Sequence, residues 1–124
     1  MTASRKLFFY VKIPIVADFV DQVGPRADRI DQILRETAIG SVIGWGDSLG
    51  EKQPNGSRIA AFHRIDIEVN EASATRRALQ MALPVLDAPF GTEIHYTIER
   101  RALMDVYSIA GWVVERPVAV ALKR

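Results

Sequence analysis

The chain has 124 residues, of which 48% are hydrophobic and 25% are charged, and its formal net charge is +1. This length and composition predict one ordinary soluble globular domain, residues 1–124. The absence of cysteine excludes disulfides, thiolate catalysis and cysteine-based zinc sites. A net charge this small gives no strong field to attract nucleic acid or an anionic membrane.

No segment of the sequence is long and apolar enough to suggest a leader peptide or a membrane span. The first apolar run, Leu7–Val11, is ended by Lys12. The core of a signal peptide needs about 7–15 apolar residues, and a transmembrane helix needs about 20. We therefore expect a cytoplasmic protein without a membrane partner.

The first half of the chain predicts a strand, a helix and a second strand. In Leu7–Ile15, apolar residues at odd positions alternate with a mixed set at even positions, as in a strand with one buried face. Helical spacing of apolar residues predicts a helix over 25–38, and a further short helical turn at 16–23 stays open. A second strand is expected around Ser41–Trp45. The glycine-rich segment from there to Ser57 is predicted to be a long or bulged hairpin loop.

The second half of the chain repeats this order. Arg58–Val69 alternates with period two and is the clearest strand in the sequence. Asn70 is a good N-cap for the helix that follows, and Pro84 is expected to kink or end that helix. A Pro-Phe-Gly turn then leads into a strand at Thr92–Arg100.

The resulting order, βαββαβ, is that of the ferredoxin-like α/β plait. We therefore predict an α+β fold in which a four-stranded antiparallel sheet, in the order 4-1-3-2, carries two helices on one face. Residues 1–100 form this core. Residues 101–124 form a C-terminal extension with apolar runs around Trp112, and an edge strand, a second hairpin or an arm reaching another subunit are all compatible with it.

One face of this predicted sheet has no helix to cover it. The first and third strands are central in the topology, which places four side chains together on the uncovered face: Phe8, Tyr10, Phe62 and Arg64. Exposed aromatic patches are usually occupied by a partner. The leading hypothesis is therefore a non-enzymatic binding module that forms a homo-oligomer or binds another protein through this face.

The strongest polar constellation is Glu93 with His95, which are two residues apart on a strand and so point to the same face. Asp66, from a strand of the same sheet, is a further candidate for this group. A carboxylate beside an imidazole can orient it as a general base. This favours a second hypothesis, a small enzyme of the dimeric α/β-barrel type in which two sheets enclose a cavity. The simpler interpretation is the solvated side of an antiparallel sheet.

A third hypothesis is an RNA-binding domain, because βαββαβ sheets with exposed aromatic residues stack bases. The same face is predicted to carry four carboxylates, which repel phosphate: Asp66, Glu68, Glu93 and Glu99. The third strand also lacks the basic-Gly-aromatic consensus of such domains. We therefore do not expect nucleic acid as a partner.

The block Gly46-Asp47-Ser48-Leu49 matches the nucleophile segment of one class of lipases and esterases, in which an Asp-x-x-His supplies the base. The residues three positions before His63 and His95 are Ala60 and Thr92, so neither histidine fits. We expect the Gly-Asp-Ser segment to end a strand and start a loop.

The loose glycine pattern at positions 44, 46 and 50 precedes a strand, whereas dinucleotide binding needs such a loop to open a helix. We therefore predict no cofactor. We also predict no metal site, although Glu93 and His95 could bind a divalent metal weakly. His63 has the parity of the core residues of its strand and is expected to be buried and hydrogen-bonded. The pair Arg76-Arg77 is expected to be solvated surface.

The second half of the chain resembles a group of small, mostly uncharacterised bacterial proteins of ferredoxin-like fold. The resemblance rests on Arg58–Val69 and on Leu86–Tyr96, which contains an Ala-Pro-x-Gly-Ser/Thr turn before the last strand. It covers about a third of the chain. It implies the α/β plait and a bacterial cytoplasmic setting, and it brings no known activity with it.

Overall fold

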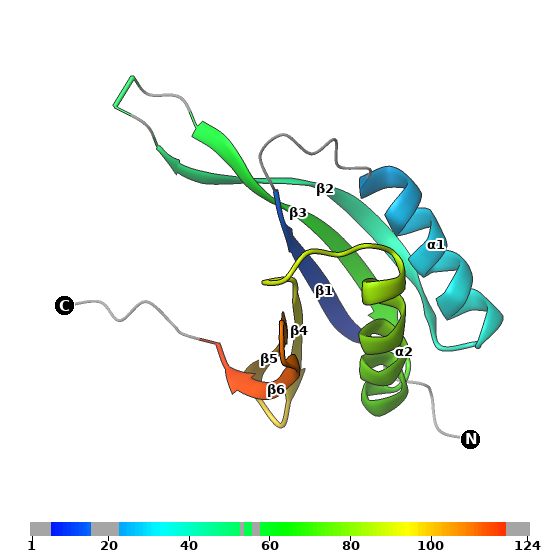
Figure 1. Cartoon of the computed structure of the whole chain (residues 1–124). Coiled ribbons are helices and arrows are strands. Elements are labelled where there is room, and N and C mark those ends of the chain that lie inside the picture. Colours follow the sequence, from blue (N-terminus) through cyan, green and yellow to red (C-terminus); the bar gives the residue numbers. More distant parts are fainter. Residues whose placement is uncertain (1–5, 16–22, 53, 56–57, 119–124) are drawn as a thin grey trace.

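The structure is a computed structural model and describes residues 6–15, 23–52, 54–55 and 58–118. In chain order its elements are β1 (Leu7–Pro14), α1 (Val23–Glu36), β2 (Gly40–Lys52), β3 (Arg58–Val69), α2 (Ala72–Val85), β4 (Glu93–Ile98), β5 (Arg101–Ser108) and β6 (Gly111–Pro117). The strands form one antiparallel sheet in the order β2-β3-β1-β4-β5-β6, and the two described helices lie on the same face of it (Figure 1). The fold is therefore α+β with a βαββαβ core. The helical turn considered for 16–23 falls almost entirely outside the described residues.

The core strands follow the predicted order, but the prediction of a four-stranded sheet is wrong, because the sheet has six strands in the part of the chain that the structure describes. The C-terminal extension adds β5 to the edge of β4, and β6 pairs antiparallel with β5. The extension is thus a second hairpin. Pairing satisfies the backbone groups of this segment and buries Leu103, which is 3% exposed, within the core.

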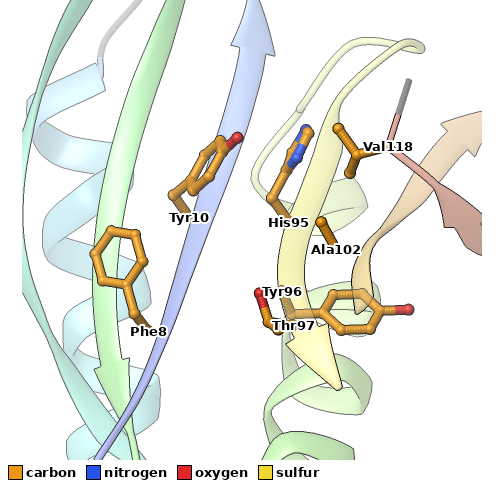
Figure 2. A pocket seen from close by; sticks show the side chains of 7 residues that line it. All are labelled: Phe8, Tyr10, His95, Tyr96, Thr97, Ala102 and Val118. Atoms are coloured by element: carbon orange, nitrogen blue, oxygen red, sulfur yellow. The ribbon is translucent and has the colours of Figure 1, made fainter. Parts of the chain in front are cut away.

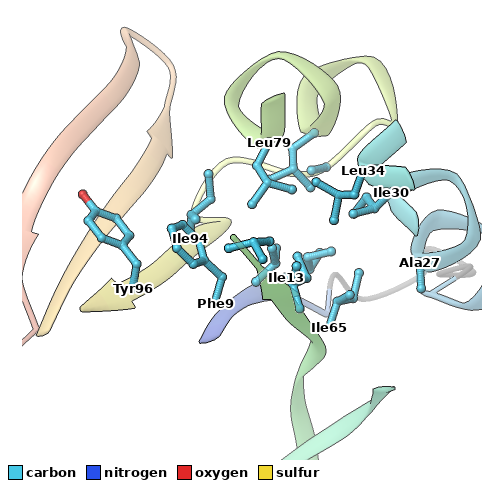
Figure 3. Packing of buried hydrophobic residues seen from close by; sticks show 14 of the residues in the cluster. Phe9, Ile13, Ala27, Ile30, Leu34, Ile65, Leu79, Ile94 and Tyr96 are labelled. Atoms are coloured by element: carbon cyan, nitrogen blue, oxygen red, sulfur yellow. The ribbon is translucent and has the colours of Figure 1, made fainter. Parts of the chain in front are cut away.

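The hydrophobic core lies between the sheet and the helices. Along β1, burial alternates residue by residue, and Phe9, Val11 and Ile13 are each at most 1% exposed. They share one buried cluster with residues of both helices, among them Ala27, Ile30, Leu34, Leu79 and Leu83 (Figure 3). Burial of each large aliphatic side chain contributes about 1.5–3 kcal/mol, which fixes the side of the sheet to which the helices bind.

The second strand is longer than predicted. A strand was expected around Ser41–Trp45 with a glycine-rich loop behind it, but β2 continues to Lys52 and pairs with β3 through several register shifts. Glycines and bulges are tolerated here because β2 is an edge strand. The β2–β3 hairpin therefore extends past the helices as an arm (Figure 1), and its turn includes Pro54 and Asn55.

The N-cap of α2 is Glu71 rather than the predicted Asn70. The Glu71 carboxylate accepts two backbone N–H groups of the first turn, at 2.9 and 2.6 Å, and its charge suits the positive end of the helix. Asn70 instead donates its side-chain amide to the carbonyl of Ala38, beyond α1. The helix ends at Val85, directly after Pro84, as expected for proline. No helix in the described part of the chain is long and apolar enough to cross a membrane.

The turn between β4 and β5 places Glu99 away from the sheet face to which the sequence assigned it. Glu99 and Arg100 have φ angles of 51° and 68° and form the two-residue connection of the hairpin. Two left-handed residues in succession are typical of a type I′ turn, whose right-handed twist matches that of the strands. Glu99 therefore lies beyond the end of β4 and does not join the carboxylates of the uncovered face.

Candidate functional site

The uncovered face of the sheet is built from the even-numbered residues of β1 and their partners on both sides. Residues opposite one another on antiparallel strands point to the same face. The register therefore places three rows of side chains across this face, namely Phe8 with Glu68, Tyr10 with Asp66 and His95, and Lys12 with Arg64 and Glu93. Phe62 lies opposite Pro14 at the end of β1. The four residues predicted to form a binding face are thus brought together.

Tyr10 is at the centre of this face. Its ring stacks on the imidazole of His95, with the ring centroids 4.4 Å apart and the planes 9° from parallel. The guanidinium carbon of Arg64 lies 3.9 Å from the Tyr10 ring centroid, and Arg64 Nε is 2.6 Å from a carboxylate oxygen of Asp66. Side chains from both neighbouring strands, Arg64 of β3 and His95 of β4, therefore contact the ring of Tyr10. Phe8, the next residue of β1 on this face, remains 48% exposed.

A second cation lies over the other aromatic ring of the face. Lys12 Nζ is 4.3 Å from the centroid of Phe62 and 3.7 Å from Oε1 of Glu93. Cation–π contacts at exposed sites contribute about 0.5–1 kcal/mol each. The basic side chains of this face thus lie closest to Tyr10 and Phe62. Arg64 is farther from Phe8, 5.9 Å from its ring centroid, and Phe8 keeps 48% of its surface exposed.

Glu93 and His95, the predicted acid–base pair, are in contact. Oε1 of Glu93 is 2.7 Å from Nε2 of His95, and His95 is 6% exposed. The hydrogen bond with His95 is the main cause that lowers the pKa of Glu93; burial opposes it and Lys12 adds to it. Glu93 is therefore a carboxylate at neutral pH. Asp66, the third candidate, pairs with Arg64 on the far side of Tyr10 and does not join the other two.

A pocket of about 100 Å³ lies beside His95. It is lined by Phe8, Tyr10, His95, Tyr96, Thr97, Ala102 and Val118. Figure 2 shows Phe8 and Tyr10 on β1, His95 and Thr97 on β4, and Ala102 with Val118 beyond them. Three strands and the residue after β6 thus contribute to one small, mainly apolar hollow on the uncovered face.

His63 lies on the opposite face of the sheet and is not part of this site. It is 8% exposed, and its Nδ1 is 2.6 Å from Oδ1 of Asp47. The prediction of a buried, hydrogen-bonded histidine is therefore confirmed. The Gly-Asp-Ser segment does not end a strand as expected, because Asp47 and Ser48 lie within β2 and pair with β3.

Sequence reasoning missed a buried polar network on the helix side of the sheet. Asp105 of β5 has no exposed surface. Its carboxylate accepts five hydrogen bonds of 2.6–3.1 Å, donated by Arg76 Nε and Nη2, Gln80 Nε2, Tyr96 Oη and the Glu115 backbone N–H. This network joins α2 to the C-terminal hairpin.

The charges of the network depend on one another. Burial alone would raise the pKa of Asp105, but the hydrogen bonds from Arg76 and Tyr96 outweigh it and lower that pKa. Burial and the bond to Asp105 raise the pKa of Tyr96 well above its ordinary range, so its hydroxyl stays a donor. The expectation of a solvated Arg76 is wrong, because its side chain is 15% exposed and paired. The available signal was Asp105 itself, an acidic residue at a core position of an apolar run.

No model of a known protein family, no curated protein and no solved structure matches the chain. The resemblance to small bacterial proteins and the setting that it implies therefore stay predictions. In the described part of the chain, no group of three or more histidine and carboxylate side chains is placed to hold a metal ion.

Proposed function

We propose that this chain is a binding module that self-associates through the uncovered face of its sheet. The observation that carries the proposal is Phe8, a 48% exposed ring on a central strand, on the face opposite the described helices. Removal of apolar surface from water is the main driving force of association. A central aromatic anchor within a polar rim is also the arrangement in which interface binding energy concentrates.

The distribution of charge favours a second copy as the partner. The cations of the face lie in the row of Lys12 and Arg64, which also contains Glu93 and is net basic. Glu68 lies two rows away beside Phe8. Glu68 forms no ion pair within the described part of the chain. A two-fold axis across the strands would bring the basic row of one copy over the Glu68 row of the other. Such a contact is self-complementary, and two-fold dimers are the commonest homo-oligomers.

A change of Phe8 to glutamate is expected to convert a dimer into a monomer. A hot-spot aromatic residue typically contributes about 2 kcal/mol or more to association, which corresponds to about 30-fold in the dissociation constant. Light scattering coupled to size-exclusion chromatography, at about 100 µM protein to favour association, measures the effect. The matched control is Met81→Glu, because Met81 is 75% exposed on α2, on the other side of the molecule, and its variant is expected to stay dimeric.

Two results would contradict this proposal. The first is a native chain that is monomeric at this concentration. The second is a folded Phe8→Glu variant that associates as strongly as the Met81→Glu control. Circular dichroism of both variants separates a loss of association from a loss of folding.

A second candidate function is a small enzyme of the dimeric α/β-barrel type. It is favoured by the contact between Glu93 and His95, 2.7 Å apart beside the pocket. In such a dimer the two facing sheets would close the pocket, and Glu93 would orient His95 as a general base. Once a substrate of the chain is identified, a His95→Gln variant is expected to keep its oligomeric state and to lose turnover of that substrate. Unchanged turnover would exclude His95 as the base.

A further inference from the structure

His95 has one ring nitrogen that is not used within the described part of the chain. Its Nε2 is bound to Glu93, and its Nδ1 has no partner there, although the residue is 6% exposed. Every buried side-chain nitrogen or oxygen among the described residues has a hydrogen-bond partner. Nδ1 must therefore keep some access to solvent, and His95 lines the pocket of about 100 Å³.

Glu93 determines the hydrogen-bonding character of that free nitrogen. An ionised carboxylate can only accept, so the Nε2 that lies 2.7 Å from it carries the proton. In a neutral imidazole the other nitrogen, Nδ1, is then an acceptor. His95 lines a pocket whose walls are mainly apolar, and we infer that its acceptor nitrogen faces this pocket. A ligand that suits it must then carry a donor on an apolar body.

We propose that this pocket binds a free single-ring phenol, with the ring against Phe8 and Val118 and the hydroxyl donating to Nδ1 of His95. The pocket is smaller than the engineered cavity of about 150 Å³ that takes up benzene. It is also half open to solvent, so only part of the ring needs to enter it. An anionic ligand is disfavoured because the carboxylate of Glu93 is next to His95. All lining residues belong to one chain, so the pocket does not need a second copy, but it shares Phe8 with the proposed contact between copies.

The test is a titration of the full chain with phenol and with toluene, followed by two-dimensional NMR. The two probes have the same number of non-hydrogen atoms, but only phenol has a donor. Phenol is expected to shift the signals of His95, Ala102 and Val118 with a dissociation constant on the order of 1 mM, as befits so small a ligand. Toluene is expected to bind about 3- to 10-fold more weakly, since one hydrogen bond contributes about 1 kcal/mol.

Two variants assign the site. His95→Phe keeps a ring against Tyr10 but removes Nδ1, and is expected to bind phenol no better than toluene. Ala102→Phe places a ring in the pocket, and is expected to bind neither probe. Met81→Gln, on the outside of α2, is the control and is expected to bind phenol as the native chain does.

Equal binding of phenol and toluene by the native chain would overturn the proposal, and so would the absence of saturable shifts. A folded His95→Phe variant that still prefers phenol would also overturn it. N-acetyl-tyrosinamide serves as a further probe, because tighter binding of this peptide mimic would assign the pocket to a tyrosine side chain of a protein instead of a free phenol. The comparison of the probes on the native chain stands even if a variant fails to fold, and the Phe8→Glu experiment tests self-association separately.

Discussion

Asp105→Leu is expected to lower the free energy of unfolding by about 3–5 kcal/mol, because it removes one partner of a buried ion pair. The guanidinium of Arg76 would keep only the 60% exposed Glu115, whose Oε2 lies 3.5 Å from Nη1. The donors of Gln80 and Tyr96 would lose their acceptor. For a domain whose total stability is about 5–15 kcal/mol, this loss is a large fraction. Urea unfolding followed by circular dichroism measures it.

The double variant Arg76→Met/Asp105→Leu separates the cost of a mostly buried guanidinium without its buried partner from the contribution of the Arg76–Asp105 pair. Since methionine and leucine leave no unpaired charge, the double variant is expected to be more stable than Asp105→Leu alone by about 2 kcal/mol. A double variant as unstable as the single one would show that the guanidinium of Arg76 is not the source of the loss.

The carboxylate of Asp105 is also expected to make the free energy of unfolding depend on pH. The pKa of Asp105 is lower in the folded chain than in the unfolded chain, so the unfolded chain takes up the proton first as the pH falls. The contribution of Asp105 to the free energy of unfolding is therefore complete above the pKa of about 4 that it has in the unfolded chain. This contribution declines as the pH falls through the lower pKa that it has in the folded chain. The free energy of unfolding, measured in urea between pH 7 and pH 3, is expected to fall less steeply for Arg76→Met/Asp105→Leu than for the native chain. An identical acid dependence would contradict this role of Asp105.

Gly40→Ala is expected to destabilise the protein by about 2–3 kcal/mol, at the upper end of the usual cost of overpacking. A Cβ atom at position 40 would lie 2.2 Å from the carbonyl oxygen of Glu68 and 2.8 Å from the Cα of Val69. Both are backbone atoms of β3, which is paired with β2 on one side and β1 on the other. Neither can move away without disturbing these pairings. Thermal and urea unfolding measure the effect.

Gly44→Ala is the matched control, since a Cβ atom at position 44 of the same strand meets nothing within 4 Å. Alanine restricts the unfolded chain more than glycine does, so this variant is expected to be neutral or more stable by up to about 1 kcal/mol. Equal losses at the two positions would contradict the close approach of the backbones at Gly40.

The central strands and their faces could be predicted because one local pattern determines both. A period-two alternation shows that a segment is a strand and also which side is buried, since a slip of one residue would expose the whole apolar set. This is why Phe9 and Ile13 were placed in the core and Phe8 and Tyr10 on the uncovered face. The contact of Glu93 with His95 follows from the same alternation.

The length of β2 and the buried network could not be predicted in this way. An edge strand rich in glycine carries the local signals of a loop, and only its pairing with β3 makes it a strand. Asp105 and Arg76 are 29 positions apart, and no local pattern links a strand of the extension to a helix of the core. Such a pair becomes visible only when the tertiary packing is known.

The contacts of α2 with the C-terminal hairpin have a consequence for anyone who divides this chain. Trp112 of β6 donates its indole N–H to the carbonyl of Gln80 at 2.9 Å, and Asp105 completes the polar side of the same helix. A fragment ending at residue 100 would retain every element of the plait and yet lack the acceptor for Tyr96. Chimeras and circular permutants should therefore carry 101–117 with the rest, because without these strands the polar side of α2 loses the hydrogen-bond partners that Asp105 and Trp112 supply.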